Sequence, residues 1–322
     1  MDKLLTVVVP VYKVEKYINK CLDSLIVPDE LMEQLEVIIV NDGTPDRSAE
    51  MAREYEKRYP QTFRVIDKEN GGHGSAWNAG VKIASGKFIK FLDSDDWLHT
   101  DNLAKIIKEL SHLETDLIFT DVSIYFANDK RTERRSFKTL KKEVIYDGEI
   151  YDWSNLNHST NFHYCFYRTK LIQSLHPLFL EKQSYDDSIL KVVFIQKTES
   201  FTYYPIIIYN YLIGRDEQTM NRNNMLKKYK DINNLILSMI DYYYNYPVNT
   251  NKTKAIKKII DNYCMEQFAL LGELPYHKSK TELASFSTFI RKRYPQCSSS
   301  KRMTIYKKVP FFIYRIIIKH FR

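Results

Sequence analysis

Residues 87–98 read KFIKFLDSDDWL, a short apolar run that ends in three carboxylates within four positions. Bounded by Gly86 and by the acidic cluster, residues 87–92 predict a buried β-strand. A polar cluster at the carboxyl end of a buried strand is typical of open α/β sheets, which bind ligands at that edge. The stretch therefore predicts both a fold class and the place of a site.

The first third of the chain repeats this rhythm of short apolar runs and helical stretches. The predicted strands are residues 4–10, 36–40, 63–66, 87–92 and 116–120. The predicted helices, from apolar residues at helical spacing, are residues 17–26, 47–59, 75–84 and 103–113. This alternation predicts an α/β fold, a doubly wound, mostly parallel sheet with flanking helices.

The pattern changes further along the chain. The charge-rich residues 129–143 predict an exposed loop or hairpin, and residues 201–213 predict a strand. Beyond residue 222, two apolar stripes at helical spacing predict packing helices, joined by a polar linker at 245–253. We therefore expect a domain of residues 1–220 that carries the site, followed by a helical region of residues 221–322.

The net charge of +8 is unevenly distributed. Residues 1–130 carry a net charge of −7, whereas residues 291–322 hold ten basic side chains and no acidic ones. A generally basic surface is therefore not expected, and we predict no nucleic-acid partner. The four cysteines form no CxxC pair, which argues against a zinc site or disulfide framework and favours a reducing compartment. We expect neither a signal peptide nor a run of the ~20 apolar residues that a spanning helix needs.

The acidic cluster has two interpretations. In an extended chain Asp93 and Asp95 face the same side. Clustered carboxylates repel one another unless a cation shares them, and Mg²⁺ or Mn²⁺ commonly bridges carboxylates to a diphosphate. The same residues would also cap a helix opened by Trp97 and Leu98. On this tripeptide alone, both interpretations stay open.

Two other polar segments follow buried strands or lead into helices. Residues 41–44 read NDGT and would be either part of a site or a simple turn before the next helix. Residues 70–75 read NGGHGS, and such a glycine-rich loop can turn backbone N–H groups and a helix N-terminus toward a phosphate. The loop is neither a Walker loop nor a GxGxxG fingerprint.

Together, in this order, the motifs resemble family-2 glycosyltransferases, which have the GT-A nucleotide-sugar fold. The resemblance covers roughly residues 4–220. Its segments are VVVPVYKVEKYINKCLDSL from residue 7, VIIVNDGTPDRS from 37, NGGHGSAWNAGVKIASGKFIKFLDSDDW from 70, YDDSIL from 185 and YLIGRDEQT from 211. It implies an enzyme of the bacterial surface-polysaccharide or protein-glycan type.

The resemblance also implies which residues hold the donor. Those assigned to the nucleotide sugar are Pro10, Val11, Tyr12, Asp42, Asn70, Gly72, Asn78, Asp93 and Ser94. Asp42 would hydrogen-bond the base, and Asp93 would hold the ribose or diphosphate side. Asp95, with Asp93, would ligate Mn²⁺ or Mg²⁺. Many members carry Arg before the Asn that is Asn78 here, and this chain has Trp77 at that place.

Tyr185-Asp186-Asp187 resembles the Glu-Asp pair of the family, whose Asp is the general base. Asp187 then occupies the base position, and Asp186 stands where Glu is usual. A sugar hydroxyl is a poor nucleophile, so a carboxylate has to take its proton during attack. A neighbouring acid and partial burial would raise the pKa of that base into a useful range. The alternative is a pair of helix N-cap residues.

Four other polar side chains are candidates for a site or for a structural role. Arg215 and Gln218 follow a predicted strand that turns at Gly214, and the resemblance implies that a basic residue here reaches the diphosphate. A plain surface arginine is the alternative. His163 resembles a histidine that precedes the second half of the site, where it would contact the acceptor, or it is a structural histidine. We interpret His73 as structural.

The C-terminal residues 301–322 mix cations with Phe, Tyr and Ile. This composition suits an anionic membrane surface. A packing helix or an oligomer contact is the alternative, and a homo-oligomer stays open.

The resemblance and these residues together predict an inverting, metal-dependent glycosyltransferase. We expect its donor to be a nucleotide-diphosphate sugar, linked to UDP, and its acceptor to be a glycan on a lipid or on a protein. We expect it in the cytoplasm, peripheral to the inner face of the membrane. One alternative is a non-catalytic, glycosyltransferase-like partner subunit. Another is a nucleotidyltransferase, but residues 10–13 do not resemble the triphosphate loop that it needs.

Overall fold

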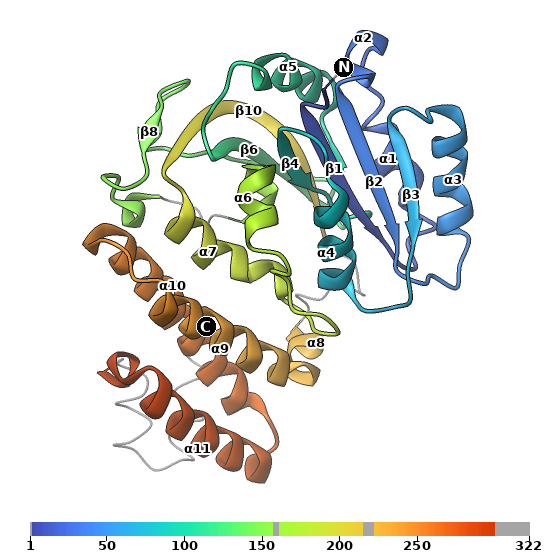
Figure 1. Cartoon of the computed structure of the whole chain (residues 1–322). Helices are drawn as coiled ribbons and strands as arrows, with labels where there is room; N and C mark the ends of the chain where they lie inside the picture. The colour runs from blue at the N-terminus through green and yellow to red at the C-terminus, as the bar shows by residue number, and fades with distance from the viewer. Residues whose placement is uncertain (1, 157–160, 215–221, 300–322) are drawn as a thin grey trace.

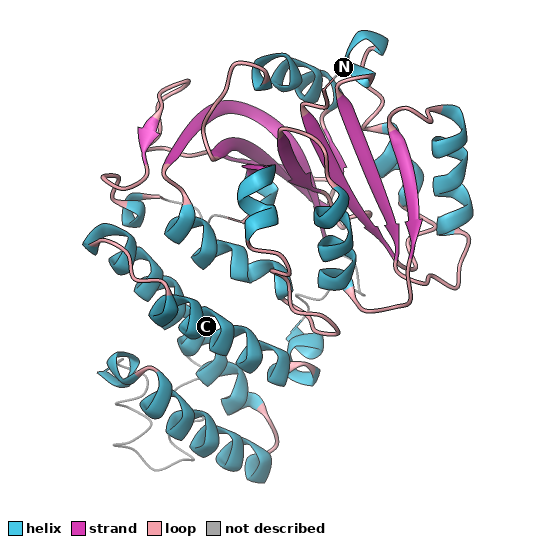
Figure 2. Ribbon diagram, viewed as in Figure 1, coloured by secondary structure: helices cyan, strands magenta, loops and turns pink. Residues whose placement is uncertain are grey.

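In the computed structural model, residues 2–156, 161–214 and 222–299 are described. A twisted sheet flanked by helices forms one part of the molecule, and a layer of long helices packs beside it (Figure 1). The sheet order is β3-β2-β1-β4-β9-β6-β10-β5, with β7 and β8 attached to β6 and β10. Figure 2 shows that helices cover both faces of the sheet, as a doubly wound fold requires.

The N-terminal half of the sheet is parallel, as predicted. It consists of β1 (Leu5–Val11), β2 (Leu35–Asn41), β3 (Phe63–Asp67) and β4 (Phe88–Phe91). β1 and β4 are buried along their whole length, which explains why they read as continuous apolar runs. Because these strands run the same way, their polar ends meet at one edge of the sheet.

The sheet is mixed beyond β4, which the sequence pattern did not predict. β9 (Cys165–Arg168) inserts antiparallel between β4 and β6 (Leu117–Phe126). β10 (Ser200–Ile213) then pairs parallel with β6. β9 is too short to show an alternating pattern. Its antiparallel course brings the residues before it opposite the acidic end of β4.

Shorter strands complete the sheet. β7 (Thr132–Arg135) pairs antiparallel with β6, so the charge-rich segment forms a hairpin on an exposed edge. β5 (Trp97–Leu98) and β8 (Tyr146–Asp147) pair antiparallel with β10. Trp97 therefore continues the acidic turn into a strand and does not open a helix, so the alternative in which the acidic cluster caps a helix here is wrong.

The flanking helices are α1 (Ile18–Asp23), α2 (Asp29–Met32), α3 (Ser48–Arg58), α4 (His73–Ile83), α5 (Thr100–Leu110), α6 (Thr169–Ser174) and α7 (Leu190–Lys197). Four of them, α1, α3, α4 and α5, lie close to the predicted ranges, and α2, α6 and α7 were not among the predicted helices. Short 3₁₀ turns cover Trp153–Asn155, Phe162–Tyr164, Asp186–Ile189 and Pro295–Ser299. α4 begins at His73, two residues before the predicted start, because Gly72 with φ +86° turns the chain directly into the helix.

The C-terminal layer is helical, as predicted. It contains α8 (Arg222–Lys227), α9 (Tyr229–Asn245), α10 (Thr250–Glu273) and α11 (Tyr276–Arg293). The predicted linker 245–253 is shorter in the structure: α9 ends at Asn245 and α10 begins at Thr250, so only residues 246–249 connect them. Asn249 caps α10 by accepting a hydrogen bond from the Lys252 N–H at 3.0 Å. Lys191 on α7 donates to the Tyr263 hydroxyl on α10 at 2.7 Å, which joins this layer to the sheet domain. Within the described residues, no helix is long and apolar enough to cross a membrane.

Candidate functional site

The acidic turn after β4 is held by β10. The Tyr209 hydroxyl donates to the Asp96 carboxylate at 2.7 Å and accepts from the Asp93 N–H at 3.2 Å. The Leu212 N–H donates to the other Asp96 oxygen at 2.8 Å. Burial and the nearby Asp93 carboxylate raise the pKa of Asp96 well above its ordinary value. Asp96 therefore anchors the turn to β10, while Asp93 and Asp95 are partly exposed.

His163 lies beside this turn. One ligand atom from each of Asp93, Asp96 and His163 lies within 4.8 Å of the other two. His163 is 8% exposed, and its Nε2 atom has no hydrogen-bond partner among the described residues. Burial lowers the pKa of His163 to about 3, which keeps the imidazole neutral, the form that ligates metals. A buried, unsatisfied nitrogen beside two carboxylates fits a divalent cation.

Asp42 organises the glycine-rich loop. The N–H groups of Gly71 and Gly72 donate to its two carboxylate oxygens at 2.9 and 2.8 Å, and Lys68 Nζ donates to it at 2.8 Å. The Asn70 side chain donates to the Asp42 backbone carbonyl at 2.9 Å. These two loop N–H groups, which the sequence suggested for a phosphate, are engaged by Asp42 in this structure.

The end of β1 lies next to the same loop. The Asp42 N–H donates to the Val11 carbonyl at 3.0 Å, which brings β1 and β2 together. Pro10 and Val11 are buried in the strand, whereas Tyr12 is 43% exposed just beyond it. Val11, Asp42, Asn70 and Gly72 are thus brought together as one group.

Asn78 lies elsewhere. It is buried in α4, accepts from the Leu178 and Phe179 N–H groups at 3.2 and 3.1 Å, and donates to the Phe179 carbonyl at 2.9 Å. It holds the segment that leads to residues 185–187. Its neighbour Trp77 is fully buried against Phe91 and Phe179, so the residue at this position is an apolar core side chain here.

The expected base lies in a constrained turn. Tyr185 has φ +67°, a left-handed conformation that directs Asp186 inward, where it is 3% exposed. Asp187 follows on the same turn. Burial first, and then the Asp186 carboxylate, raise the pKa of Asp187 to about 6, against an opposing effect of Lys191.

His73 joins the two acidic segments. Its Nε2 atom lies 3.0 Å from Asp93 Oδ1, and its Nδ1 atom lies 3.0 Å from Asp186 Oδ2. Burial alone would lower the pKa of His73, but the Asp186 and Asp93 carboxylates outweigh it and hold that pKa well above its ordinary value. The sequence interpretation of His73 as a plain structural residue missed this bridge. The feature of the sequence that could have indicated the bridge is the histidine within the glycine-rich loop, at the point where the helix begins.

The predicted site residues Arg215 and Gln218 and the tail 301–322 lie outside the described residues.

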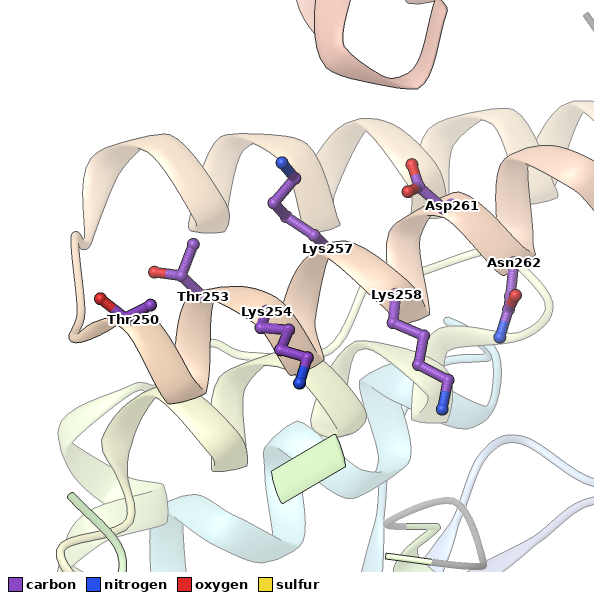
Figure 3. A pocket seen from close by; sticks show the side chains of 7 residues that line it. All are labelled: Thr250, Thr253, Lys254, Lys257, Lys258, Asp261 and Asn262. Atoms are coloured by element: carbon purple, nitrogen blue, oxygen red, sulfur yellow. The ribbon is translucent and has the colours of Figure 1, made fainter. Parts of the chain in front are cut away.

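An open pocket of about 530 Å³ lies on α10 and shares no residue with the acidic site (Figure 3). Its lining residues are Thr250, Thr253, Lys254, Lys257, Lys258, Asp261 and Asn262. Three lysines make it a basic helix face, and we assign it no role.

A comparison with known protein families places the chain. The model of glycosyl transferase family 2 matches residues 6–175, more than half of the chain. The chain belongs to glycosyl transferase family 2. The matched region of the family takes in the acidic turn after β4, the glycine-rich loop and His163.

Proteins similar to this chain in sequence are named glycosyltransferases. The uncharacterized glycosyltransferase EpsJ of Bacillus subtilis is 41% identical over 118 residues, which are 37% of this chain and 33% of that protein. An uncharacterized glycosyltransferase of Mycoplasma pneumoniae, described as an MG025 homolog, is 31% identical over 227 residues, 69% of this chain and 72% of that protein. The chain thus matches only a third of the length of EpsJ.

The fold has a close counterpart among solved structures. Staphylococcus aureus TarS in complex with UDP-GlcNAc superposes with a TM-score of 0.71 at 17% identity, over 99% of this chain and 91% of that one. At this identity the likeness concerns the fold, and it confirms the expected GT-A architecture with its C-terminal helices.

Proposed function

We propose that the protein is an inverting, metal-dependent glycosyltransferase that transfers a sugar from a nucleotide-diphosphate sugar, UDP-linked, to a hydroxyl of a glycan acceptor. The observation that carries this proposal is the pairing of two acidic segments across one site. Asp93 would hold the donor, and Asp187, with a pKa of about 6, would take the proton of the acceptor. His73 lies between Asp93 and Asp186, the residue before Asp187.

Asp187 would be the general base. A carboxyl group with a pKa near 6 is ionised at neutral pH, yet is basic enough to accept a proton from an attacking hydroxyl. Asp186 is buried and engaged by His73, so it is less available for this role. One displacement on the face opposite the leaving group would invert the anomeric carbon without a covalent sugar–enzyme intermediate, the same stereochemical logic as in inverting hydrolases.

The donor would lie across the edge formed by β1, β2 and β4. Pro10, Val11, Tyr12 and Asp42 would line the base, with exposed Tyr12 able to cover it. The UDP-GlcNAc complex of TarS supports a UDP-linked donor for a chain of this fold. Asn70 and Gly72 would act by shaping the loop, and Arg215 and Gln218 would reach the diphosphate.

Asp93 and Asp95 would hold Mn²⁺ or Mg²⁺, and Asp96 and His163 offer further oxygen and nitrogen ligands beside Asp93. Such an ion, when bound, neutralises the charge that develops on a departing diphosphate. A position beside Asp93 would also let His163 contact the transferred sugar or the acceptor.

The acceptor would be a bacterial surface glycan, carried on a lipid at the cytoplasmic face of the membrane or attached to a protein. Residues 1–220 would bind the donor and perform the chemistry. The helical region 221–322 would bring the basic tail 301–322 to an anionic leaflet.

A panel of nucleotide sugars tests the proposal. With Mn²⁺ present, we expect a UDP-sugar to raise the melting temperature and to be hydrolysed slowly to free UDP. Binding without release of UDP in the presence of any acceptor would favour the non-catalytic partner instead. Absence of both binding and hydrolysis across UDP-, GDP-, CDP- and dTDP-sugars would refute the donor assignment.

A further inference from the structure

The segment that leads to the proposed base packs against the helix on which His73 lies. Residues 178–186 contact α4 and the glycine-rich loop before it. The Lys182 N–H donates to the Gly71 carbonyl at 2.7 Å, and Asn78 holds the backbone of Leu178 and Phe179. The glycine-rich loop therefore positions the base segment as well as the donor side.

Gly74 makes the approach close enough for the bridge. A Cβ atom at this position would meet Asp186 Oδ2 at 2.7 Å and would also clash with the Leu180 carbonyl. Only glycine lets the Asp186 carboxylate reach the first turn of α4, where the His73 ring stands. The ring is further held by its contact with buried Trp77, with ring centroids 4.2 Å apart.

We propose that His73 is a positioning residue that couples the donor-side carboxylate Asp93 to the base segment through Asp186. Its two ring nitrogens lie 3.0 Å from these two carboxylates, which belong to segments far apart in the chain. The rigid ring sets the spacing between the two segments, and it occupies Asp186 so that Asp187 is the carboxylate left for proton transfer. This inference rests on the proposed function for its kinetic part only.

The role differs from that of a core histidine. About a third of the His73 side chain and 28% of the Asp93 side chain stay exposed, so this end of the bridge is open to solvent and not in the core. Removing the ring leaves a space that a small diffusible molecule can enter. A misplaced base costs turnover more than donor binding, because orientation matters most in the transition state.

The test uses His73→Gly, with added imidazole, on the full chain. We expect kcat to fall about 30-fold or more while the dissociation constant for UDP changes less than about threefold. Free imidazole should restore kcat at least about fivefold in this variant and leave the wild type unchanged. His112→Gly, which removes an exposed histidine after α5, is the matched control and should show neither effect.

A second readout does not need activity. Amide hydrogen exchange of residues 180–190, measured without donor, should rise in His73→Gly and fall again with imidazole. If His73→Gly does not fold, His73→Gln serves, since a glutamine amide can bond one carboxylate but cannot span both, and the same exchange and kcat losses are expected.

The outcomes separate the two proposals. A wild-type protein that binds no nucleotide sugar refutes the function, and the exchange experiment still decides the bridge. If the wild type turns over, either of two results overturns the positioning role. One is a His73→Gly variant with the same kcat as the wild type, and the other is a variant whose lost activity imidazole does not restore. Combining His73→Gly with Asp186→Ala should lower kcat no further than the worse single variant, because both remove the same link.

Discussion

The Nζ atom of Lys90 lies 2.7 Å from the carbonyl oxygen of His163, in the fully buried layer beneath the site. Lys90 also donates to the carbonyls of Phe162 and Cys165 at 3.0 and 3.1 Å. Burial lowers the pKa of this ammonium to about 7. Lys90 on β4 therefore stabilises the turn before β9 by these three hydrogen bonds. The turn in its place holds His163 beside Asp93.

Replacing Lys90 with Met should destabilise the protein by roughly 2–4 kcal/mol, because three buried carbonyls each lose a hydrogen bond from the ammonium. The Phe162 carbonyl still accepts from the Cys165 N–H. Urea unfolding followed by circular dichroism measures the change. Lys105→Met, at an exposed position of α5, is the control and should shift stability little. Equal stability of the two variants would show that the three hydrogen bonds contribute nothing net.

Asp187→Asn should keep donor binding and lose turnover by a factor of about 10²–10⁴, the usual contribution of a general base. Single-turnover transfer and UDP titration together measure the two effects. Asp186→Asn should cost less, because the side-chain amide of that variant can still accept a hydrogen bond from the His73 ring. Normal turnover of Asp187→Asn would remove this residue from the mechanism.

The pKa of about 6 for Asp187 predicts a pH dependence with a defined sign. The base has to be ionised, so kcat/KM should fall about tenfold for each pH unit below about 6 and level off above it. Initial rates between pH ~4.5 and ~8 in buffers of constant ionic strength test this. A flat profile through pH ~5 would contradict a base with this pKa.

The same shift affects stability. In the unfolded chain an aspartate has a pKa of about 3.9, so between pH ~4 and ~6 the folded state binds the proton more tightly. This contribution to the free energy of unfolding therefore falls as pH rises through that window. Thermal unfolding should show that Asp187→Asn gains stability relative to the wild type as the pH rises from ~4 to ~6, with no further gain above it.

Metal removal tests the acidic turn. EDTA should abolish transfer, and Mn²⁺ or Mg²⁺ should restore it. Electron paramagnetic resonance of Mn²⁺ should report affinity lowered at least about tenfold by Asp95→Asn. Asp101→Asn, at an exposed position of α5, is the control with the same loss of charge. An enzyme that keeps full activity in EDTA would exclude the metal assignment.

Deleting residues 301–322 should release the protein from anionic vesicles without changing UDP affinity, because the deleted segment carries basic charge and no acidic residue. Co-sedimentation with phosphatidylglycerol vesicles measures the release, and neutral phosphatidylcholine vesicles are the control. Equal sedimentation of both proteins would rule out the tail as the membrane contact.

Much of the fold was predictable because local apolar periodicity sets buried strands and helices. β1, β2, β3 and β4 lie close to their predicted ranges. β9 was not predictable from its four residues, since its antiparallel place depends on what lies beside it. The alternative in which Asp93, Ser94 and Asp95 cap a helix opened by Trp97 is wrong for the same reason, because Trp97 pairs with Asn210, 113 residues away.

The candidate site, like the fold, was predictable only in part from the sequence. The sequence alone determined the α/β class, the acidic cluster at the end of β4 and the pair Asp186-Asp187, because these are contiguous motifs with local causes. Only the tertiary structure decided that His73 spans Asp93 and Asp186, that Asp42 holds the glycine loop and that Lys90 supports His163. Each of these contacts joins residues far apart in the chain, and their approach is set by packing and burial, which no local pattern encodes.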